Sequence, residues 1–304
     1  MSLGTDNFTY ADLDVSIPEV YGQKINDYFR YKLSLAPFFV DRSDELADGG
    51  SVVYTPNLSA LSTNVKANQS QVTLSSPTYT TQTLTVSTWK EASFVIEDRE
   101  AAQIKKSYYL QDKIAQGGAY EVAQDLDDAI AALFSGFSAS FGASTTNIAD
   151  SDLLAAIATL ESAGVPGVQD SSGDVAFIFH PNTFYRQIGS IDKLTLWQNT
   201  GSEMLRMKPG TKMLYGIPVI VTPAVGVTLG SRNNVLVHKD AIHWARLSMP
   251  VKAAKGYVGS EGVRVQQSYV HEYLGDLVTI DLCYGVIENR DSYGVLLKSI
   301  QTVA

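Results

Sequence analysis

The sequence predicts an α+β protein in which an extended hairpin and a long helix precede a mixed domain. Residues 51–89 are rich in Ser, Thr and β-branched residues and hold one charged side chain, Lys66, a composition typical of strands. Residues 96–137 instead place apolar side chains at spacings of three, four and seven, which predicts one long amphipathic helix. Beyond residue 140, strand-like and helix-like segments alternate, as in a compact mixed domain.

Composition and charge exclude several classes of protein. The chain has 304 residues, of which 45% are apolar, so it can bury a substantial core. Its net charge of -9 and isoelectric point near 4.9 oppose specific binding to a polyphosphate, which requires clustered Lys and Arg. The single cysteine, Cys283, excludes an intramolecular disulfide and a thiolate-cluster zinc site, and we expect it to be a small buried side chain.

No segment predicts export or membrane insertion. The first thirty residues contain no apolar run after a basic start, and no window approaches eighteen uncharged apolar residues. We therefore expect no membrane partner.

Residues 1–50 predict an N-terminal arm that is extended or weakly helical. Pro18 and Pro37 interrupt it. Between them lies a short amphipathic stretch formed by Val20, Ile25, Tyr28 and Phe29.

Residues 51–90 predict a protruding β-hairpin with a wide polar tip. Its strands read SVVYTPNL and QTLTVSTWKEASFVI, and residues 57–88 contain fourteen Ser and Thr. Because a segment with so few large apolar residues cannot bury itself in its own core, and isolated hairpins are marginally stable, it needs a docking surface. We expect that surface on a neighbouring molecule.

The helix predicted over about residues 96–137 would be roughly 60 Å long. Gly117 and Gly118 lie midway and make a kink or a break possible. The acidic residues Asp125, Asp127 and Asp128 resemble a metal site, but no histidine or second carboxylate cluster stands at ligand spacing, so we interpret them as a solvated helix face.

The remaining segments predict the mixed domain in order. DLLAAIATLESAGVPG predicts a helix capped by Asp150 or Ser151 and stopped by Gly164. A buried strand, residues 175–179, leads into a short helix that starts at Pro181. Further strands are predicted in LYGIPVIVTP, at residues 235–238, and in GVRVQQSYVHEYL, DLVTIDLCYGVIE and SYGVLLKSI, with a turn or short helix near Asp240.

No catalytic, cofactor or metal site is predicted. The sequence lacks the nucleophile elbow, the dinucleotide and phosphate-binding glycine loops, and the paired zinc histidines. His238 and His243 are five residues apart, roughly 140° around a helix, which does not suit a shared metal. We interpret these two histidines, together with His180 and His271, as hydrogen-bonded polar groups at strand ends or interfaces.

The order of these segments resembles one family. The chain is similar to major capsid proteins of tailed bacteriophages with the Hong Kong 97-like fold. The similarity lies in the order of its segments: an arm, a charge-poor hairpin, a long helix, a mixed domain with LYGIPVIV and VLVHKDAIHWA, and the closing DLVTIDLCYGVIENRDSYGVLL. The resemblance covers essentially the whole chain, and the order of the motifs carries it more than any motif alone.

The resemblance assigns a role to each region. It implies that residues 51–90 are the extended loop (E-loop), that 91–140 and 262–290 form the peripheral domain with its spine helix, and that 141–261 and 291–304 form the axial domain. We hypothesise that the hairpin contacts a neighbouring subunit through the following positions: Val65, Lys66, Val72, Leu74, Leu84, Val86 and Trp89.

The resemblance also implies a function. The chain would be a non-enzymatic head protein that builds hexamers and pentamers of an icosahedral shell around a double-stranded DNA genome. It would assemble in the host bacterial cytoplasm, reside in the virion and touch the packaged DNA only nonspecifically. Its expected partners are a separate scaffolding protein, a portal and, in some relatives, a decoration protein. We expect the scaffolding protein to be separate because only about fifty residues precede the hairpin.

Two alternatives share these features. An encapsulin-type nanocompartment shell protein has the same fold. A surface-layer or filament subunit would share the charge-poor hairpin and the sixteen tyrosines, which fit buried subunit contacts. Particle size by negative-stain microscopy separates these alternatives from a capsid and from a monomeric enzyme.

Some members of the family cross-link a lysine of the E-loop to an asparagine on a neighbouring subunit. Lys66 would supply the amine here, but the asparagine position is Asp276. Since a carboxylate is a far poorer acyl donor than an amide, we expect noncovalent cohesion.

Overall fold

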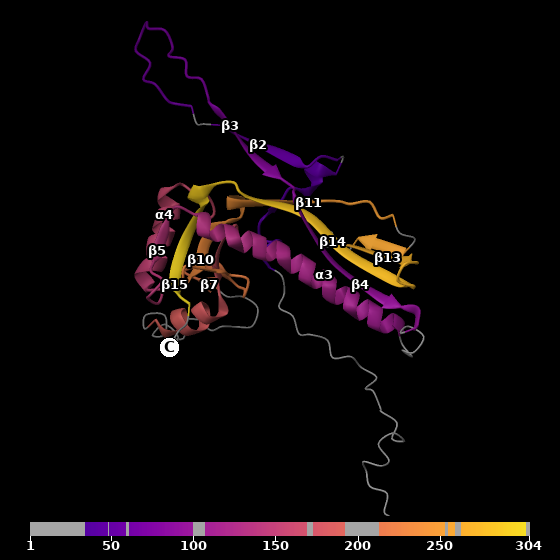
Figure 1. Ribbon diagram of the computed structural model, residues 1–304. Helices are drawn as coiled ribbons and strands as arrows, with labels where there is room; N and C mark the ends of the chain where they lie inside the picture. The colour runs from indigo at the N-terminus through magenta and orange to yellow at the C-terminus, as the bar shows by residue number, and fades with distance from the viewer. Residues whose placement is uncertain are drawn as a thin grey trace, which may run out of the picture. The chain divides into compact units, whose positions relative to one another are not determined.

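A computed structural model of the chain describes residues 34–47, 49–58, 61–99, 107–168, 173–191, 213–252, 255–258 and 263–301. The amphipathic stretch predicted in the arm, Val20 to Phe29, lies outside these residues. The described residues from 34 onward belong to one compact unit, Lys32–Ala304. Within the described part of the chain the strands form two large sheets and one two-stranded hairpin (Figure 1).

The six-stranded sheet is built around the long strand β14, Gly275–Glu288. Its order is β1 (Val40–Asp41), β11 (Ile242–Leu247), β14, β13 (Arg264–Val270) and β12 (Lys255–Val258), with β4 (Thr88–Glu97) also paired to β14. β4 and β11 both pair with Cys283 and Tyr284, so they occupy opposite edges of β14. β14 is therefore hydrogen-bonded along both edges.

The seven-stranded sheet forms the second layer of strands. Its order is β5 (Ser140–Gly142), β15 (Gly294–Ile300), β10 (Ser231–His238), β6 (Val175–Phe179), β8 (Ile217–Val221) and β7 (Met213–Leu214), with β9 (Val227–Thr228) added to β10. The strand predicted at residues 175–179 is β6, and all five of its side chains are buried. Such a continuous apolar run is typical of a strand covered on both faces.

Helix α4, Asp150–Ser162, packs beside β15 and β5 in Figure 1. Gly164 ends it with a positive φ of 69°, as its position predicts. The predicted N-cap is wrong, because the helix is capped at Ala149, whose N–H donates to the carboxylate of Asp152 at 3.0 Å. The short helix predicted after Pro181 is present as Thr183–Gln187 and Ile188–Ser190.

Helix α3, Ser107–Ala132, runs along β14 and β4 (Figure 1) and continues into a 3₁₀ turn, Leu133–Gly136. The helix was predicted from about residue 96, but β4 extends through Glu97, because its pairing with β14 outweighs the helical periodicity there. The helix passes through Gly118 without a break. A Cβ atom at Gly118 would lie 2.6 Å from Cδ1 of Ile280, so this glycine allows α3 to approach β14 closely.

The strand pairing differs from the predicted division of the chain in two ways. Strands β11 and β12 belong to the six-stranded sheet, although the boundary at residue 261 placed them in the other domain. The predicted second hairpin strand is two strands: β3 (Tyr79–Thr85) pairs with β2 (Val52–Leu58), whereas β4 leaves the hairpin for β14.

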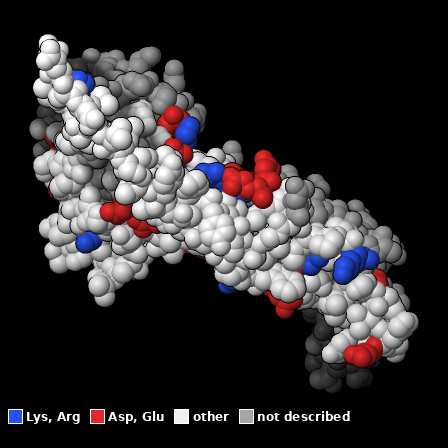
Figure 2. Space-filling model, turned by 90° about the horizontal axis from the view of Figure 1, so that it is seen from above, with Lys and Arg blue, Asp and Glu red and all other residues white. Residues whose placement is uncertain are grey.

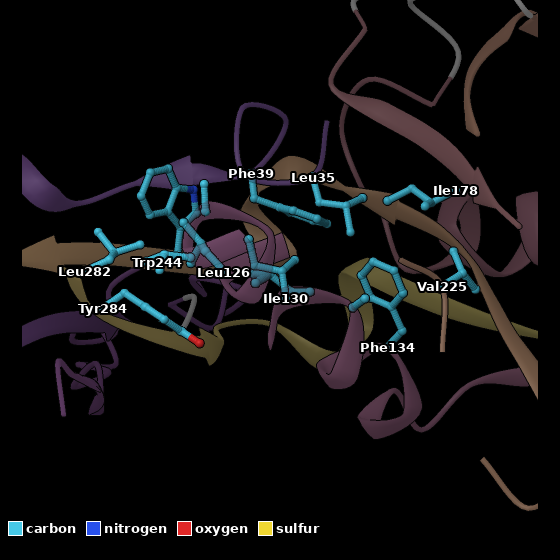
Figure 3. Packing of buried hydrophobic residues seen from close by; sticks show 14 of the residues in the cluster. Leu35, Phe39, Leu126, Ile130, Phe134, Ile178, Val225, Trp244, Leu282 and Tyr284 are labelled. Atoms are coloured by element: carbon cyan, nitrogen blue, oxygen red, sulfur yellow. The ribbon is translucent and has the colours of Figure 1, made fainter. Parts of the chain in front are cut away.

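One large hydrophobic cluster joins both sheets to α3 (Figure 3). It contains Ile130 and Phe134 from α3 and its following turn, Trp244 from β11 and Ile178 from β6. Leu35, which precedes the first strand, is fully buried in the same cluster. A second cluster lies between α4 and the seven-stranded sheet.

Asp127 corrects the interpretation of the acidic cluster as a solvated face. Its side chain is fully buried, and its carboxylate accepts backbone N–H groups of Ser34 (3.0 Å), Leu35 (3.2 Å) and Ala36 (2.9 Å). The indole N–H of Trp244 donates to the carbonyl of Ala36 at 2.9 Å. These bonds fix the point at which the N-terminal segment enters the core.

Replacing this buried carboxylate is expected to destabilise the protein strongly. Asp127→Ala leaves three backbone N–H groups without their acceptor, so the free energy of unfolding should fall by about 3 kcal/mol or more. Asp128→Ala, an exposed aspartate on the same helix, is the matched control and should change it by less than about 0.5 kcal/mol. Urea denaturation of both variants measures the difference, and equal losses would contradict the role of Asp127.

Candidate interaction surface

The hairpin of β2 and β3 presents the largest group of exposed apolar side chains. The strands pair from Val52 with Thr85 to Leu58 with Tyr79, and residues 61–78 between them form an exposed tip that projects from the sheets in Figure 1. The exposed large apolar side chains of the hairpin are Tyr54, Leu58, Leu61, Val65, Val72, Leu74 and Tyr79.

The two faces of the hairpin differ. Side chains alternate along a strand, so Tyr54, Pro56 and Leu58 share one face with Tyr79, the partner of Leu58. On this face Tyr54, Leu58 and Tyr79 are each more than 60% exposed. We call the side chains of Tyr54, Pro56, Leu58 and Tyr79 the outer face of the hairpin.

The opposite face anchors the hairpin to its own chain. Val53 and Leu84 pair across the strands and pack with Leu46, Val86 and Ala245 in a small core cluster. At its end, β3 also packs closely against β14, since a Cβ atom at Gly285 would lie 2.2 Å from the carbonyl oxygen of Thr85. The base of the hairpin is therefore stabilised within the chain, while its tip is not.

These positions correct part of the predicted contact set. Leu84 and Val86 are 2% and 5% exposed, so their side chains are not available to a neighbouring chain. The alternation of β3 points Leu84 inward, and Val86 follows the same side where the chain turns toward β4. Both residues belong to the contact set hypothesised from the sequence.

The other predicted contact residues lie at the surface. Val65 is fully exposed, Leu74 is 90% exposed, and Val72 and Trp89 are about two-thirds exposed. Lys66 donates from Nζ to the carbonyl of its neighbour Ala67 at 3.1 Å. Their contact with a second subunit stays a prediction.

Trp89 is also held by its own chain. Its indole N–H donates to Oδ2 of Asp281 at 2.8 Å. Arg264 binds the same carboxylate through two bonds, from Nε at 2.9 Å and Nη2 at 2.6 Å, and this pairing raises the pKa of Arg264. Asp281 is 1% exposed, so β4, β13 and β14 are joined at a buried charge pair directly beneath the exit of the hairpin.

Sequence reasoning missed four exposed residues: Tyr54, Leu58, Leu61 and Tyr79. For Tyr54 and Leu58 a signal existed, because the strand VVYTPNL places Tyr, Pro and Leu at every second position. This pattern marks an apolar face but does not say which face is buried.

Charge is sparse on this part of the surface. Lys66 is the only charged side chain from 51 to 89. Figure 2 shows the charged groups of one face gathered in a few small clusters, with wide uncharged areas between them. Just beyond residues 51–89, Nζ of Lys90 lies 3.8 Å from Oδ2 of Asp125. An uncharged surface with exposed apolar groups is typical of a protein contact site.

The four histidines carry no arrangement for catalysis within the described residues. Nδ1 of His180 accepts the N–H of Asn182, and Nδ1 of His238 accepts that of Asp240, both at 3.1 Å. Nε2 of His243 lies 3.3 Å from the amide of Asn289, and His271 packs edge-on against Tyr269.

Burial lowers the pKa of three of these histidines. Nearby Arg232 adds to the effect at His180 and Arg42 at His243, and both pKa values fall to about 4. The pKa of His238 is lowered mainly by burial. These imidazoles are therefore neutral near pH 7.

No metal site or membrane span is apparent in the described ranges. They contain no group of three or more His, Cys, Asp or Glu side chains placed to hold a metal ion. None of their helices has the length and apolar character needed to cross a bilayer.

Asp276, the predicted counterpart of the cross-linking asparagine, lies at the start of β14 and accepts the side-chain amide of Gln267 at 3.2 Å. That Lys66 and Asp276 do not form a cross-link stays a prediction.

A pair of leucine substitutions tests the division between base and tip. Leu84→Ala should lower the free energy of unfolding by about 2–4 kcal/mol, because it opens a cavity in the anchor cluster. Leu74→Ala, at an exposed position of the tip, should leave it within about 0.5 kcal/mol. Thermal and urea denaturation of the unassembled chain measure the free energy of unfolding of both variants. A large loss from Leu74→Ala would show that the tip packs on its own chain.

Comparison with known proteins identifies the fold. No protein-family model matches the sequence, and no curated protein matches it either. Solved structures do match over nearly the full length. A structure described as Mycobacterium phage Che8 is 18% identical, with 92% of this chain and 96% of that chain covered at a TM-score of 0.70.

Two further structures are described as capsids. The capsid structure of the cyanophage P-SCSP1u is 13% identical, covering 99% of this chain and 97% of that chain at a TM-score of 0.69. The mature capsid of bacteriophage PhiM1 is 11% identical, covering 99% and 98% at a TM-score of 0.71. The chain therefore has the Hong Kong 97-like fold of tailed-phage capsid proteins, the fold that its sequence resemblance predicted.

Proposed function

We propose that this protein is a major capsid protein that assembles into the icosahedral head shell of a tailed phage and encloses its double-stranded DNA. The observation that carries the proposal is the hairpin, whose base is anchored in the chain and whose outer face and tip expose apolar side chains with almost no charge. The capsid fold of the matching structures supports the same assignment.

The hairpin would act as a clamp between subunits. Its outer face and tip would lie over helix α3 and the six-stranded sheet of a neighbour. Leu74, Val72 and Tyr79 would fill shallow grooves there, and the many Ser and Thr hydroxyl groups would donate and accept hydrogen bonds. Each contact is weak, but contact area repeated over every copy in a closed shell holds the assembly together without covalent links.

The anchor explains why such a clamp can bear load. The tie of Trp89 and Arg264 to Asp281 joins the exit of the hairpin to the central strand β14. A pull on the tip would therefore pass into the six-stranded sheet rather than unfold the base of the hairpin.

We assign the domains by their sheets. The six-stranded sheet with α3 would be the peripheral domain, and the seven-stranded sheet with α4 would be the axial domain that meets its copies around the hexamer or pentamer axis. The N-terminal arm, predicted over residues 1–50, would contact a neighbouring subunit.

The remaining partners follow from this role. A separate scaffolding protein would guide assembly, a portal would occupy one vertex, and a decoration protein could bind the finished shell. The net charge of -9 would keep contact with packaged DNA weak and nonspecific. The shell would assemble in the host cytoplasm and remain in the virion.

Shell formation tests the proposed function directly. The full chain, expressed with and without candidate scaffolding protein, should form closed icosahedral particles visible by cryo-electron microscopy. Small uniform shells that retain a cargo enzyme would instead support an encapsulin-type compartment. Monodisperse monomers under every assembly condition would contradict both.

Shortening the hairpin tests its role as the clamp. Replacing residues 59–78 with an Asn-Gly turn keeps the pairing of Leu58 with Tyr79 and should give a folded chain, of unchanged melting temperature, that forms no shells. Leu74→Asp should weaken assembly in the same direction, since it places a charge in an apolar contact. Leu154→Asp, at an exposed leucine on α4, is the matched control. Normal shells from the shortened chain would refute the clamp.

A further inference from the structure

The two strands of the hairpin differ in what their free edges present. Within the described residues β2 and β3 pair only with each other, so each strand has one edge without a partner strand. Such an edge carries a row of unused N–H and C=O groups, which can pair with a strand of another molecule. Among the described strands, β4 is a further long strand with a free edge, because it pairs with β14 alone.

The hydrogen-bond pattern of the hairpin follows from Pro56. Pro56 stands opposite Thr81 and has no N–H, so this pair is not one of the hydrogen-bonded pairs of the antiparallel ladder. The bond from the N–H of Val86 to the carbonyl of Ser51, at 2.8 Å, gives the same pattern, because this pair lies an odd number of positions further along both strands. Thr81 therefore turns its N–H and C=O away from β2.

Alternate residues form the free edge of β3. Tyr79 and Thr83 have the same orientation as Thr81, since hydrogen-bonded and free positions alternate along a strand. The next residue of this set, Thr85, already lies against β14, because a Cβ atom at Gly285 would be 2.2 Å from the carbonyl oxygen of Thr85. Tyr79, Thr81 and Thr83 are all exposed. We call the main-chain groups of these three residues the β3 edge.

The β3 edge lacks the features that protect exposed edges from pairing. Proline and charged side chains are two common protections. β2 has Pro56 on its free edge, and β4 carries Lys90, Glu91 and Glu97. β3 reads YTTQTLT, with no proline and no charge, and its Tyr and Thr residues favour strands. Of these three strands, β3 is therefore the one open to a partner.

A second copy of this chain is the partner that fits. This step rests on the proposed function, which surrounds each chain with copies of itself. Pairing two copies brings identical strands together, so like charges would repel, but residues 51–89 hold one charge, Lys66. If β3 pairs with β3 of the second copy, one contact covers the exposed edge of both chains, whereas any other partner strand would leave one of these edges open.

We propose that the β3 edges of two copies pair antiparallel and join their hairpins into one continuous sheet. The two-fold axis passes beside Thr81, so Thr81 faces the partner subunit's Thr81 and Tyr79 faces the partner subunit's Thr83. This register uses every residue of the β3 edge and gives about six main-chain hydrogen bonds. The hairpin projects from the two large sheets (Figure 1), so the edge lies away from the body of its own chain.

This contact is expected to be weak by itself. Each main-chain bond replaces bonds to water and adds little net free energy, and small isolated sheets are marginally stable. The pairing becomes effective where other contacts already hold two copies close together, because the local concentration of the second edge is then high. Edge pairing therefore strengthens an assembly of copies and does not start one.

Disulfide trapping tests the register in the full-length chain. Thr81→Cys, made in a Cys283→Ala background, places two thiols opposite each other on Cα atoms about 5.5 Å apart, a separation that a disulfide spans. Under mild oxidation the chains should become linked at least about tenfold faster than those of Tyr54→Cys, an exposed position on β2 and the matched control. Non-reducing electrophoresis of unassembled chains and of shells measures both rates. Equal rates would overturn the proposal.

A proline substitution tests the main-chain bonds. Thr81→Pro removes the N–H that faces the second copy but no hydrogen bond of the hairpin, so the melting temperature should not change. The association constant, measured by sedimentation of concentrated unassembled chain, should fall about tenfold, because two bonds of the pair are lost. Thr81→Val keeps the N–H and is the control, which should associate like the wild type. Equal association constants for these two variants would contradict edge pairing.

Amide hydrogen exchange gives a readout that needs no substitution. In separated chains the N–H groups of Tyr79, Thr81 and Thr83 should exchange quickly, and those of Thr80 and Gln82, which bond to β2, slowly. In concentrated protein or in shells the first group should become protected. Protection without a Thr81→Cys disulfide would mean that another strand covers the edge, which overturns the assignment of β3 as partner. Absence of protection would overturn the pairing altogether.

A failure of this contact and a failure of the proposed function give different results. Shells that form normally while Thr81→Cys stays unlinked and the β3 edge exchanges quickly would refute edge pairing and leave the capsid assignment intact. Linked Thr81→Cys chains that never form shells would support edge pairing and count against the capsid assignment.

Discussion

The pairing of β14 along both edges is the constraint on which the rest of the structure depends. One edge takes β4, which comes directly from the hairpin, and the other takes β13 and then β11. One face is covered by α3, whose approach requires Gly118. The buried carboxylate of Asp281 on the same strand fixes Trp89 and Arg264. A single strand therefore aligns the long helix, the hairpin and the crossing to the second sheet.

Local sequence patterns predicted the helices and strands better than they predicted the contacts between them. The run 175–179 is a strand because continuous apolar sequence is buried on both sides, and Gly164 ends α4 because it adopts a left-handed conformation. Asp127 could not be predicted in this way, since the three N–H groups that it accepts lie more than ninety residues away in sequence. Periodicity indicates which residues share a face of a helix, but not which polar side chain on the inner face finds a donor.

The candidate surface was predicted in composition but not in detail. The lack of charge follows from residue type, which the sequence reports directly. The exposure of Val65 and Leu74 follows from the small number of large apolar residues in the tip, which cannot bury each other. The burial of Leu84 and Val86 depends instead on the contact with Ala245, a residue of a distant strand. The base of the hairpin is therefore anchored in the chain, whereas its tip is unsupported. Only the unsupported tip was evident from the amino-acid pattern.

The carboxylate of Asp127 has a consequence for how the chain can vary. It binds the main chain of residues 34–36 and none of their side chains, so the polarity of those side chains is not selected by this contact. Proline is the exception at all three positions, because it lacks the N–H that the carboxylate requires. Leu35 is separately restricted by its burial. Substitutions at Ser34 and Ala36 that fit the packing around these two residues should therefore keep the three hydrogen bonds to Asp127.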